Sequence, residues 1–453
     1  MDKSTLTRRA FLAATTTSAA VAVGCARVND AKVVPGKVSP NEKINVAGIG
    51  VGGKGMGDIS SCRHENIVAL CDPDRDRAAE AFYRYANAKQ YADYRKMLDE
   101  MGDEIDACTI STPDHSHAPA AYQAMKLGIH LYVQKPLTHT VAESRLLAKV
   151  AKETGVITQM GNQGHCQDGV RELCEMMWSG AIGDVTEAHI WTNRPIWPQG
   201  IPEPLPEETP IPDTLDYDLW IGPAPMRPYN SGYVPWNWRA WWDFGCGAIG
   251  DMACHIMDPA FWSLKLYEAK SYTIQAVYEE GMNSQTGPNK STIKYQFPAR
   301  GAMPPVTVYW HDGGILPPRP EDVPEDQQLG DGNNGSLYFG TNGYLTAGEY
   351  GGKARLLPDE RMADYTKPAP TIPRIPNENP YQNWLDGIRS GVPAASDFSY
   401  AGPLTEVANM GNVALHSGDK ELEIDVVNLR VVNDANANTL LTKEYRAGWE
   451  LPC

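Results

Sequence analysis

The stretch KINVAGIGVGGKGMG, residues 43–57, places a short apolar run directly before a cluster of glycines. The apolar run is typical of a buried strand, and the residues after the glycines have the pattern of a helix start. The glycines have the spacing G-x-G-x-x-G, which a dinucleotide-binding turn needs for a tight turn, for close approach of a pyrophosphate and for helix–strand packing. We therefore expect the phosphates of a dinucleotide to contact Gly48, Gly50, Val51, Gly52 and Gly53.

A second apolar run, residues 67–71, ends at Asp72, 19 residues after Gly53. A carboxylate at the end of the second strand of such a unit accepts hydrogen bonds from the hydroxyls of the adenosine ribose. The new helix also directs unpaired N–H groups and a partial positive charge at the phosphates. The sequence therefore predicts a bound dinucleotide, and Asp72 favours NAD over NADP.

The chain has 453 residues, enough for two domains with separate cores. It carries 40 basic and 56 acidic residues, a net charge of −16. Nucleic acids and anionic membranes both require a basic face on their partner. The charge balance therefore argues against both as partners.

Residues 1–25 have the character of a targeting segment. Residues 7–12, TRRAFL, resemble a twin-arginine export motif, and residues 22–25, AVGC, resemble a lipobox in which Cys25 is acylated. We expect an exported protein, periplasmic or anchored to the membrane only through Cys25, with residues 26–42 as a tether. The alternative is an uncleaved, frayed terminus. The apolar segment is too short to remain as a bilayer span.

From residue 43 to residue 161, apolar strands alternate with helical patterns. This alternation predicts a Rossmann domain with a doubly wound parallel sheet and ligands at the carboxyl ends of its strands. Residues 162–453 follow a different pattern, with a proline- and tryptophan-rich loop at 193–236 and mainly strands at 271–357. We expect a second α/β domain with an open, mainly antiparallel sheet that binds the substrate. A loop this long is typically functional, and its aromatic side chains suit a carbohydrate.

Two strand ends of the predicted Rossmann domain carry residues of interest. Thr112, Pro113 and His117 follow the strand at 107–111, and we expect them to contact the cofactor. Lys135 follows the next strand, where its ammonium could orient a nicotinamide and hydrogen-bond a substrate hydroxyl; the alternative is a surface lysine.

The segment WWDFGCGAIGDMACH, residues 241–255, places Asp251 and His255 four residues apart on one predicted helix face. Imidazole is a natural general base near neutral pH, and a nearby carboxylate can orient it or raise its pKa. The alternatives are a capping Asp with a buried His, or half of a metal site. His165, His115 and His117 could reach the same cleft, but their spacing lacks a metal-ligand signature, so no metal is expected. The expected substrate contacts are Asn162, Gln163, His165, Trp191, Trp242 and His255.

Taken together, these motifs resemble the glucose–fructose oxidoreductase / inositol dehydrogenase (Gfo/Idh/MocA) family over nearly all of residues 43–452. The resemblance implies a Rossmann domain, a C-terminal α/β domain with an open sheet, and a homo-oligomer. It implies Lys135, Asp251 and His255 as the catalytic set, and Trp238 and Arg239 near the cofactor. The family's usual E-K-P reads here as Gln134-Lys135-Pro136.

The expected function is an NAD(P)-dependent oxidoreductase that removes hydride at a ring hydroxyl of a sugar or sugar derivative. His255, aided by Asp251, would take the hydroxyl proton while Lys135 stabilises the alkoxide. Because an exported enzyme meets no NAD(H) pool, its cofactor would be tightly bound. One alternative is a redox-neutral NAD-dependent glycosidase, similar to the family's exported α-N-acetylgalactosaminidases, which work through a 3-keto sugar. Another is a non-catalytic sugar-binding lipoprotein.

Overall fold

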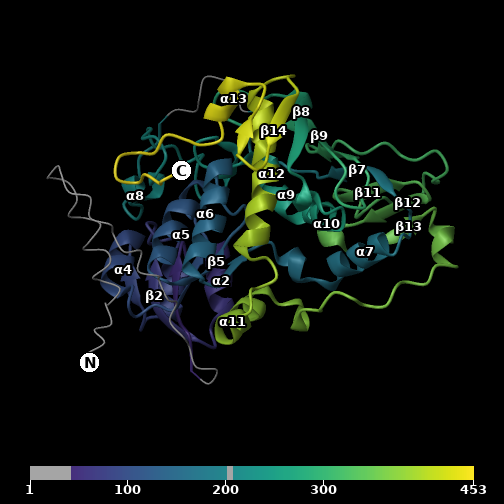
Figure 1. The fold of residues 1–453 in the computed structure, drawn as a ribbon. Helices are drawn as coiled ribbons and strands as arrows, with labels where there is room; N and C mark the ends of the chain where they lie inside the picture. Colours follow the sequence, from purple (N-terminus) through teal and green to yellow (C-terminus); the bar gives the residue numbers. More distant parts are fainter. Residues whose placement is uncertain (1–41, 201–207) are drawn as a thin grey trace, which may run out of the picture.

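The structure, a computed structural model, describes residues 42–200 and 208–453. The predicted export motif at residues 7–12 and Cys25 lie outside the described residues. Two sheets form the framework, one in each half of the molecule, and the long helix α12 runs between them (Figure 1).

The first sheet has six parallel strands in the order β3-β2-β1-β4-β5-β6. Its central strands are mainly apolar and buried along nearly their whole length, as expected where helices cover both faces. The predicted Rossmann sheet is therefore confirmed. Its strands are β1 (Asn45–Ile49), β2 (Asn66–Cys71), β3 (Lys89–Tyr91), β4 (Ala107–Ile110), β5 (His130–Val133) and β6 (Thr158–Met160). Its helices are α2 (Lys54–Ser61), α3 (Ala79–Arg84), α4 (Tyr94–Met101), α5 (His117–Lys126) and α6 (Val141–Thr154).

The second sheet has nine strands in the order β13-β12-β11-β7-β10-β9-β8-β14-β15. Only the β7–β10 pair is parallel, so the expected open, mainly antiparallel sheet is confirmed. Its strands are β7 (Val185–Trp191), β8 (Ser271–Glu280), β9 (Lys290–Phe297), β10 (Val306–His311), β11 (Gly335–Gly340), β12 (Gly343–Ala347), β13 (Arg355–Leu357), β14 (Leu422–Asp425) and β15 (Arg430–Val431).

Helices from the C-terminal half join the two sheets. Helix α12 (Phe398–His416) packs against α6 of the Rossmann domain and against α9 (Gly247–Ile256). One apolar core extends from Leu131 in the first sheet to Ile274 in the second. Helix α9 is thereby held at the junction of the two halves. The remaining helices are α7 (Asp168–Trp178), α8 (Tyr217–Ile221), α10 (Asp258–Ser263), α11 (Pro380–Ser390) and α13 (Ala435–Thr439).

The segment after Asp72 is less helical than the pattern of residues 74–88 predicts. The side chain of Asp72 accepts from the main-chain N–H of Asp74 at 3.0 Å, and that of Asp74 accepts from the N–H of Asp76 at 3.1 Å. These side-chain bonds favour turns over helix. Regular α-helix therefore starts only at Ala79.

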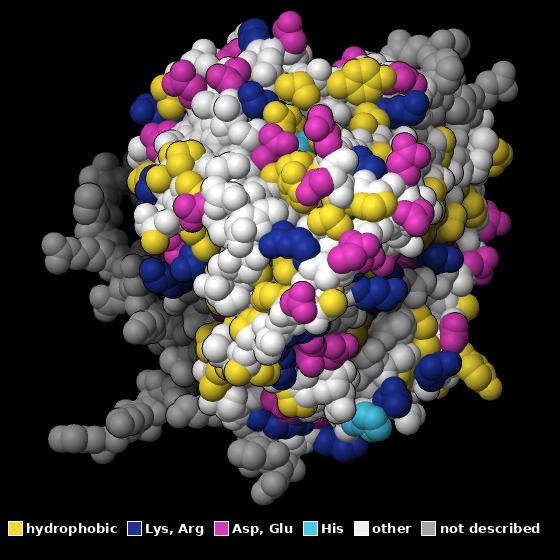
Figure 2. Space-filling model, turned by 90° about the vertical axis from the view of Figure 1, so that its right-hand side faces the viewer, with side chains coloured by type: hydrophobic (Ala, Val, Ile, Leu, Met, Phe, Trp, Pro, Cys, Tyr) yellow, Lys and Arg dark blue, Asp and Glu magenta, His cyan; other side chains and the backbone are white. Residues whose placement is uncertain are grey.

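Basic and acidic side chains are interspersed on the face of the C-terminal half shown in Figure 2. Among the described residues, no helix is both long and apolar enough to cross a membrane. Seven of the eight cysteines that the structure describes are buried thiols, and Cys453 is exposed.

Candidate active site

The glycine turn after β1 is built as the motif requires. Gly50 has φ +73°, and a Cβ there would lie 2.8 Å from the main chain of Ser111. Gly53 caps the N-terminus of α2 with φ 54°. Close packing of the helix on the turn depends on Gly55, where a Cβ would lie 1.7 Å from the Gly50 oxygen.

Asp72 lies at the end of β2, beside this turn. Its Oδ2 accepts from the Gly52 N–H at 3.1 Å. The side chain is 7 % exposed, and burial raises the pKa of the Asp72 carboxyl to about 6. Its position at the glycine turn is the one expected of a ribose-binding acid.

A cavity of about 420 Å³ runs from Asp72, past the glycine turn, to α9. Because Gly50 and Gly52 line it without side chains, the main chain of the turn is accessible to a phosphate. The shape and donor set fit an extended dinucleotide. Of the sequence-predicted site residues, the cavity is lined by Gly50, Gly52, Asp72, Thr112, Pro113, Lys135, Gln163, Trp238, Arg239, Asp251 and His255. Gly48, which lies in β1, and Val51 and Gly53, which lie in the turn after it, are absent from this lining.

Lys135 and Asp251 form a partly buried ion pair at the other end of the cavity. Lys135 Nζ donates to Asp251 Oδ1 at 2.7 Å and to the Asp251 main-chain oxygen at 2.7 Å. Arg239 Nε donates to the same Oδ1 at 3.0 Å. Burial alone would raise the pKa of Asp251, but the charges of Lys135 and Arg239 hold it well below its usual range. Asp251 is therefore ionised and fixes both cations.

His255, one turn along α9, lines the same cavity and is 5 % exposed. Its Nδ1 has no hydrogen-bond partner among the described residues. Burial, together with the charge of Lys135, lowers the pKa of His255 to about 3, so the ring is neutral at pH 7. The charge of Asp251 raises the pKa of His255, as expected, but burial and the charge of Lys135 outweigh it. The side-chain hydrogen bonds of Asp251 are made with Lys135 and Arg239.

The candidate histidines His115, His117 and His165 do not line the cavity. His117 joins two strand-end loops: Nδ1 lies 2.8 Å from the Pro136 oxygen and Nε2 lies 2.9 Å from the Thr112 oxygen. It therefore positions the cofactor groove without lining it, which corrects the predicted direct contact. His115 is buried among the main-chain oxygens of Phe244, Trp220 and Ile221.

His165 is also misassigned as a substrate contact. Its Nδ1 lies 3.0 Å from both oxygens of Asp258, and its ring packs against Trp262 and Tyr400. A buried imidazole held by a carboxylate and two aromatic rings serves packing. The pattern of residues 161–165 gives no sign of Asp258, which lies far along the chain.

Two tryptophans and one asparagine that were expected to contact the substrate also lie outside the lining of the large cavity. Trp191 is fully buried in a separate apolar cluster, and its Nε1 donates to the Gly332 oxygen at 2.9 Å. Trp242 lines a different cavity of about 170 Å³ and packs against His416. Asn162 is buried outside the lining of the large cavity. The predicted substrate contacts that line the cavity are Gln163 and His255.

Tyr350 is a cavity residue that the sequence did not reveal. It follows β12 and has φ 63°, a conformation that is strained for an aromatic residue. Its ring meets that of His255 edge-on at 5.1 Å, and its hydroxyl accepts from Gln163 Nε2 at 3.2 Å. Other lining residues missed from the sequence are Arg77, Asp114, Arg194, Trp197, Trp236 and Glu349.

Gln134 has a defined partner in Asp58 of α2. Gln134 Nε2 donates to Asp58 Oδ2 at 2.8 Å, and the same oxygen accepts from Ser111 Oγ at 2.6 Å. Asp58 is fully buried. Position 134 carries an amide in place of the family's usual carboxylate because α2 already supplies a carboxylate, Asp58, at the same place. In residues 42–200 and 208–453, no group of three or more His, Cys, Asp or Glu is arranged to hold a metal ion.

Comparison with known families agrees with this geometry. Residues 43–162 match the NAD-binding Rossmann fold of the Gfo/Idh/MocA oxidoreductase family, and residues 197–302 match the C-terminal alpha/beta domain of that family.

Similar curated proteins include both dehydrogenases and glycosidases. A glycosyl hydrolase family 109 protein of Shewanella woodyi is 32% identical over 171 residues, covering 35% of this chain and 36% of that protein. The scyllo-inositol 2-dehydrogenase (NAD(+)) of Bacillus subtilis is 31% identical over 125 residues, 28% of this chain and 36% of the enzyme. The chain thus spans about a third of the length of the curated relatives it matches.

Solved structures share the fold at low identity. The WlbA dehydrogenase of Bordetella pertussis, in complex with NADH and UDP-GlcNAcA, has a TM-score of 0.56 at 15% identity, over 83% of this chain and 98% of that chain. Levoglucosan dehydrogenase, in complex with NADH and L-sorbose, has a TM-score of 0.54 at 17% identity, over 85% and 99%.

Proposed function

The chain belongs to the Gfo/Idh/MocA oxidoreductase family, and on this premise we propose that it oxidises a ring hydroxyl of a sugar or sugar derivative with NAD(P). The observation that carries the proposal is the single cavity that joins Asp72 and the glycine turn to Lys135, Asp251 and His255. Relatives and fold neighbours named as sugar or inositol dehydrogenases support it.

The side chains at the α9 end suit removal of a proton and a hydride from one carbinol. A bound nicotinamide supplies the hydride acceptor. His255 is neutral at pH 7 and takes the hydroxyl proton. Lys135 donates a hydrogen bond to the same oxygen and stabilises the negative charge that develops on it. Asp251 holds the Lys135 ammonium in place, and Arg239 donates to the same carboxylate oxygen of Asp251.

The walls near this end suit a sugar. Trp197 and Trp236 line the cavity beside Arg239, whose guanidinium lies 4.3 Å from the centre of the Trp236 ring. Aromatic faces pack on the apolar side of a sugar ring, while Gln163 and Arg194 offer hydrogen-bond donors to its hydroxyls. This combination of aromatic and polar groups supports a carbohydrate substrate.

The test is a screen of sugars and polyols with added NAD or NADP, in which the formation of NADH or NADPH is measured. The wild-type protein is expected to reduce the cofactor with at least one sugar. His255→Asn and Lys135→Met are expected to lower kcat/KM by about 100-fold or more. His64→Asn, a change at an exposed histidine outside the cavity lining, is the matched control. If both active-site variants keep full activity, the roles given to His255 and Lys135 are wrong. If no sugar reduces the cofactor with the wild-type protein, a sugar-binding role without catalysis gains support.

A redox-neutral glycosidase is the second candidate, favoured by the relatives named as glycosyl hydrolase family 109 proteins and as an alpha-N-acetylgalactosaminidase. In that reaction His255 and Lys135 would serve the transient oxidation of the sugar, and the aglycone would leave by elimination. Glycoside cleavage that needs NAD but yields no net NADH would favour this candidate. Sustained NADH formation from a free sugar would favour the dehydrogenase.

Asp72 supports NAD as the cofactor of this site, with NADP as the less favoured ligand. Export by the twin-arginine route and acylation of Cys25 remain part of the proposal, resting on residues 7–12 and 22–25. Fractionation of cells that express the full chain tests both, with Cys25→Ala as the variant that would be released from the membrane. A homo-oligomer is proposed from the family resemblance, and light scattering of the purified protein tests it.

A further inference from the structure

Helix α12 carries three polar side chains on one face near its C-terminal end. Asn409, Asn412 and His416 follow one another at spacings of three and four residues, which places them on the same side of the helix. All three line a second cavity, of about 170 Å³. Among the described residues, none lines both this second cavity and the large cavity of the candidate active site. The second cavity is therefore a separate feature of the molecule.

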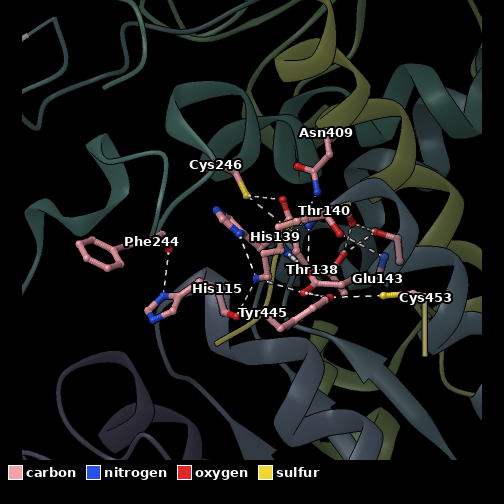
Figure 3. A network of polar contacts seen from close by, with 12 residues as sticks. His115, Thr138, His139, Thr140, Glu143, Phe244, Cys246, Asn409, Tyr445 and Cys453 are labelled. Carbon is pink, nitrogen blue, oxygen red and sulfur yellow. Dashed lines mark hydrogen bonds and ion pairs between the residues drawn. The ribbon is translucent and has the colours of Figure 1, made fainter. Parts of the chain in front are cut away.

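The main chain fixes the orientation of both asparagine amides. Asn409 Nδ2 donates to the Thr138 oxygen at 3.0 Å (Figure 3), and Asn412 Nδ2 donates to the Cys246 oxygen at 3.0 Å. The Oδ1 atom of each side chain has no hydrogen-bond partner among the described residues. Asn409 is 3 % exposed, and a buried acceptor without a partner is costly. Both amide oxygens therefore suit a ligand that donates hydrogen bonds.

An aromatic wall lies in the same cavity. Trp242, which was expected to contact a sugar, lines the second cavity, and its ring centre lies 4.6 Å from that of His416. Trp242 Nε1 donates to the Asn283 oxygen at 3.2 Å, which holds the indole in place. Val413 and Leu440 add aliphatic surface. Water could satisfy the amide oxygens but would gain nothing from these apolar groups, whereas the C–H face of a sugar ring packs on them.

The lining of the second cavity is uncharged near pH 7. In the part of the chain that the structure describes, no Asp, Glu, Lys or Arg lines it. Burial and the neighbouring charge of Lys443 hold the pKa of His139 well below its usual range, and desolvation lowers the pKa of His416. Lys443 itself is paired with Glu143 at 3.1 Å. Because a charged ligand would find no counter-charge in this lining, the cavity favours a neutral one.

The volume of the second cavity fits one six-membered ring. A cavity of about 150 Å³ holds a benzene ring, whereas one water molecule takes up only about 30 Å³. At about 170 Å³, the second cavity has room for one ring of this kind.

We propose that the second cavity binds one uncharged, hydroxyl-bearing six-membered ring, a pyranose sugar or a cyclitol. Hydroxyls of the ring donate to Asn409 Oδ1 and Asn412 Oδ1, and its C–H face packs on Trp242. This inference is independent of the proposed function, because the residues that carry it belong to the second cavity alone.

The test titrates the full-length protein with D-glucose, D-galactose and myo-inositol and follows binding by saturation-transfer NMR of the ligand protons. At least one probe is expected to bind at a site that persists in the double variant Lys135→Met/His255→Asn, which alters only the large cavity. Asn412→Leu removes one acceptor, and Trp242→Leu removes the aromatic wall. Each is expected to weaken this binding about fivefold or more. Asn87→Leu, at an exposed asparagine outside both cavities, is the matched control and should bind the probe as the wild type does.

Charged analogues test the preference for a neutral ligand. D-galacturonate and D-galactosamine should bind at this site about fivefold or more weakly than D-galactose, because each would bring an unpaired charge into the lining. Equal binding of the charged and neutral sugars would contradict the proposal.

The remaining outcomes separate this inference from the proposed function. If the double variant binds no probe, or if Asn412→Leu and Trp242→Leu both leave binding unchanged, the proposal is overturned and the cavity holds water only. Neither result touches the proposed function, which depends on the large cavity. Thermal unfolding checks the folding of each variant. Because the two substitutions lie in different segments, Trp242→Leu decides the matter if Asn412→Leu fails to fold.

Discussion

Lys135 Nζ lies 2.7 Å from a carboxylate oxygen of Asp251 and 2.7 Å from the main-chain oxygen of the same residue. One residue of α9 thus holds the ammonium with both its side chain and its backbone. Because Lys135 follows β5 of the Rossmann domain and Asp251 belongs to the C-terminal half, this contact also joins the two halves at the site.

Replacing Asp251 by Asn should strongly lower both catalytic activity and thermal stability. The change leaves the partly buried Lys135 and Arg239 cations together without their shared anion, which destabilises the site. We expect kcat/KM to fall by about 100-fold or more and the melting temperature to drop. Asp243→Asn, which breaks an ion pair with Arg227 outside the cavity lining, is the control and should retain most activity. Near wild-type activity of Asp251→Asn would contradict the role given to this pair.

The pH dependence of the reaction should reflect a lowered histidine pKa. Burial and the Lys135 charge lower the pKa of His255 to about 3. A base with a lowered pKa stays neutral as the pH falls, so kcat/KM measured on cofactor-loaded protein should show no loss centred near pH 6.5. Rate profiles between pH 8 and pH 5 test this expectation. An acid limb at the ordinary histidine pKa that disappears in His255→Asn would contradict it.

The Gln134–Asp58 contact can be tested with two substitutions, the second of which should restore the stability lost in the first. Gln134→Glu would place a second carboxylate against Asp58, whose oxygen now accepts from the Gln134 amide at 2.8 Å. We expect the free energy of unfolding to fall by about 1–3 kcal/mol, since a buried donor is replaced by a like charge. Adding Asp58→Asn should restore stability in part, and urea unfolding measures both steps. If Gln134→Glu alone is as stable as wild type, Asp58 does not explain the amide.

Cofactor preference should depend on Asp72 and on Arg77. The Arg77 side chain lies over the glycine turn, since a Cβ on Gly53 would sit 2.5 Å from Arg77 Nη2. Asp72→Ser removes a charge that repels a 2′-phosphate and leaves Arg77 to bind it. We expect the NADP-to-NAD affinity ratio to rise about tenfold or more, and to fall back when Arg77→Gln is added. Binding titrations with both nucleotides test this, and an unchanged ratio would contradict it.

The preference for NAD over NADP should also depend on pH. Burial raises the pKa of Asp72 to about 6, so the carboxyl takes up a proton as the pH falls through that value. Loss of the negative charge weakens repulsion of a 2′-phosphate, and the NADP-to-NAD affinity ratio should therefore rise between pH 7.5 and pH 5. Titrations on Asp72→Ser provide the control, because that variant should lack this component of the shift.

The glycine turn and the parallel sheet could be predicted because their signals are local. Strand, turn, helix and Asp72 lie within 30 residues, and each step follows from backbone sterics or apolar periodicity. The start of α12 could not, because Pro403 lies inside the helix, where proline is unfavourable. The helix begins at Phe398, capped by Asp397, whose side chain accepts from the Ser399 N–H.

The candidate site could be predicted from the sequence only where one short segment fixes the position of the functional residues relative to one another. Asp251 and His255 meet that condition on α9. Lys135, the partner of Asp251, follows β5, and Asp258, the partner of His165, lies in α10. Tyr350 reaches the cavity from a β12–β13 connection in a strained conformation that no residue pattern encodes. Contacts between distant segments are set by tertiary packing, which the sequence does not display.

Identification of the nucleotide released when the purified full-length protein is denatured tests the central claim most directly. Protein prepared without added cofactor is expected to release close to one equivalent of NAD(H) or NADP(H) per chain. Recovery of no nucleotide, together with no binding of NAD or NADP by the same preparation, would contradict the dinucleotide site. Both enzymatic candidates would then be excluded.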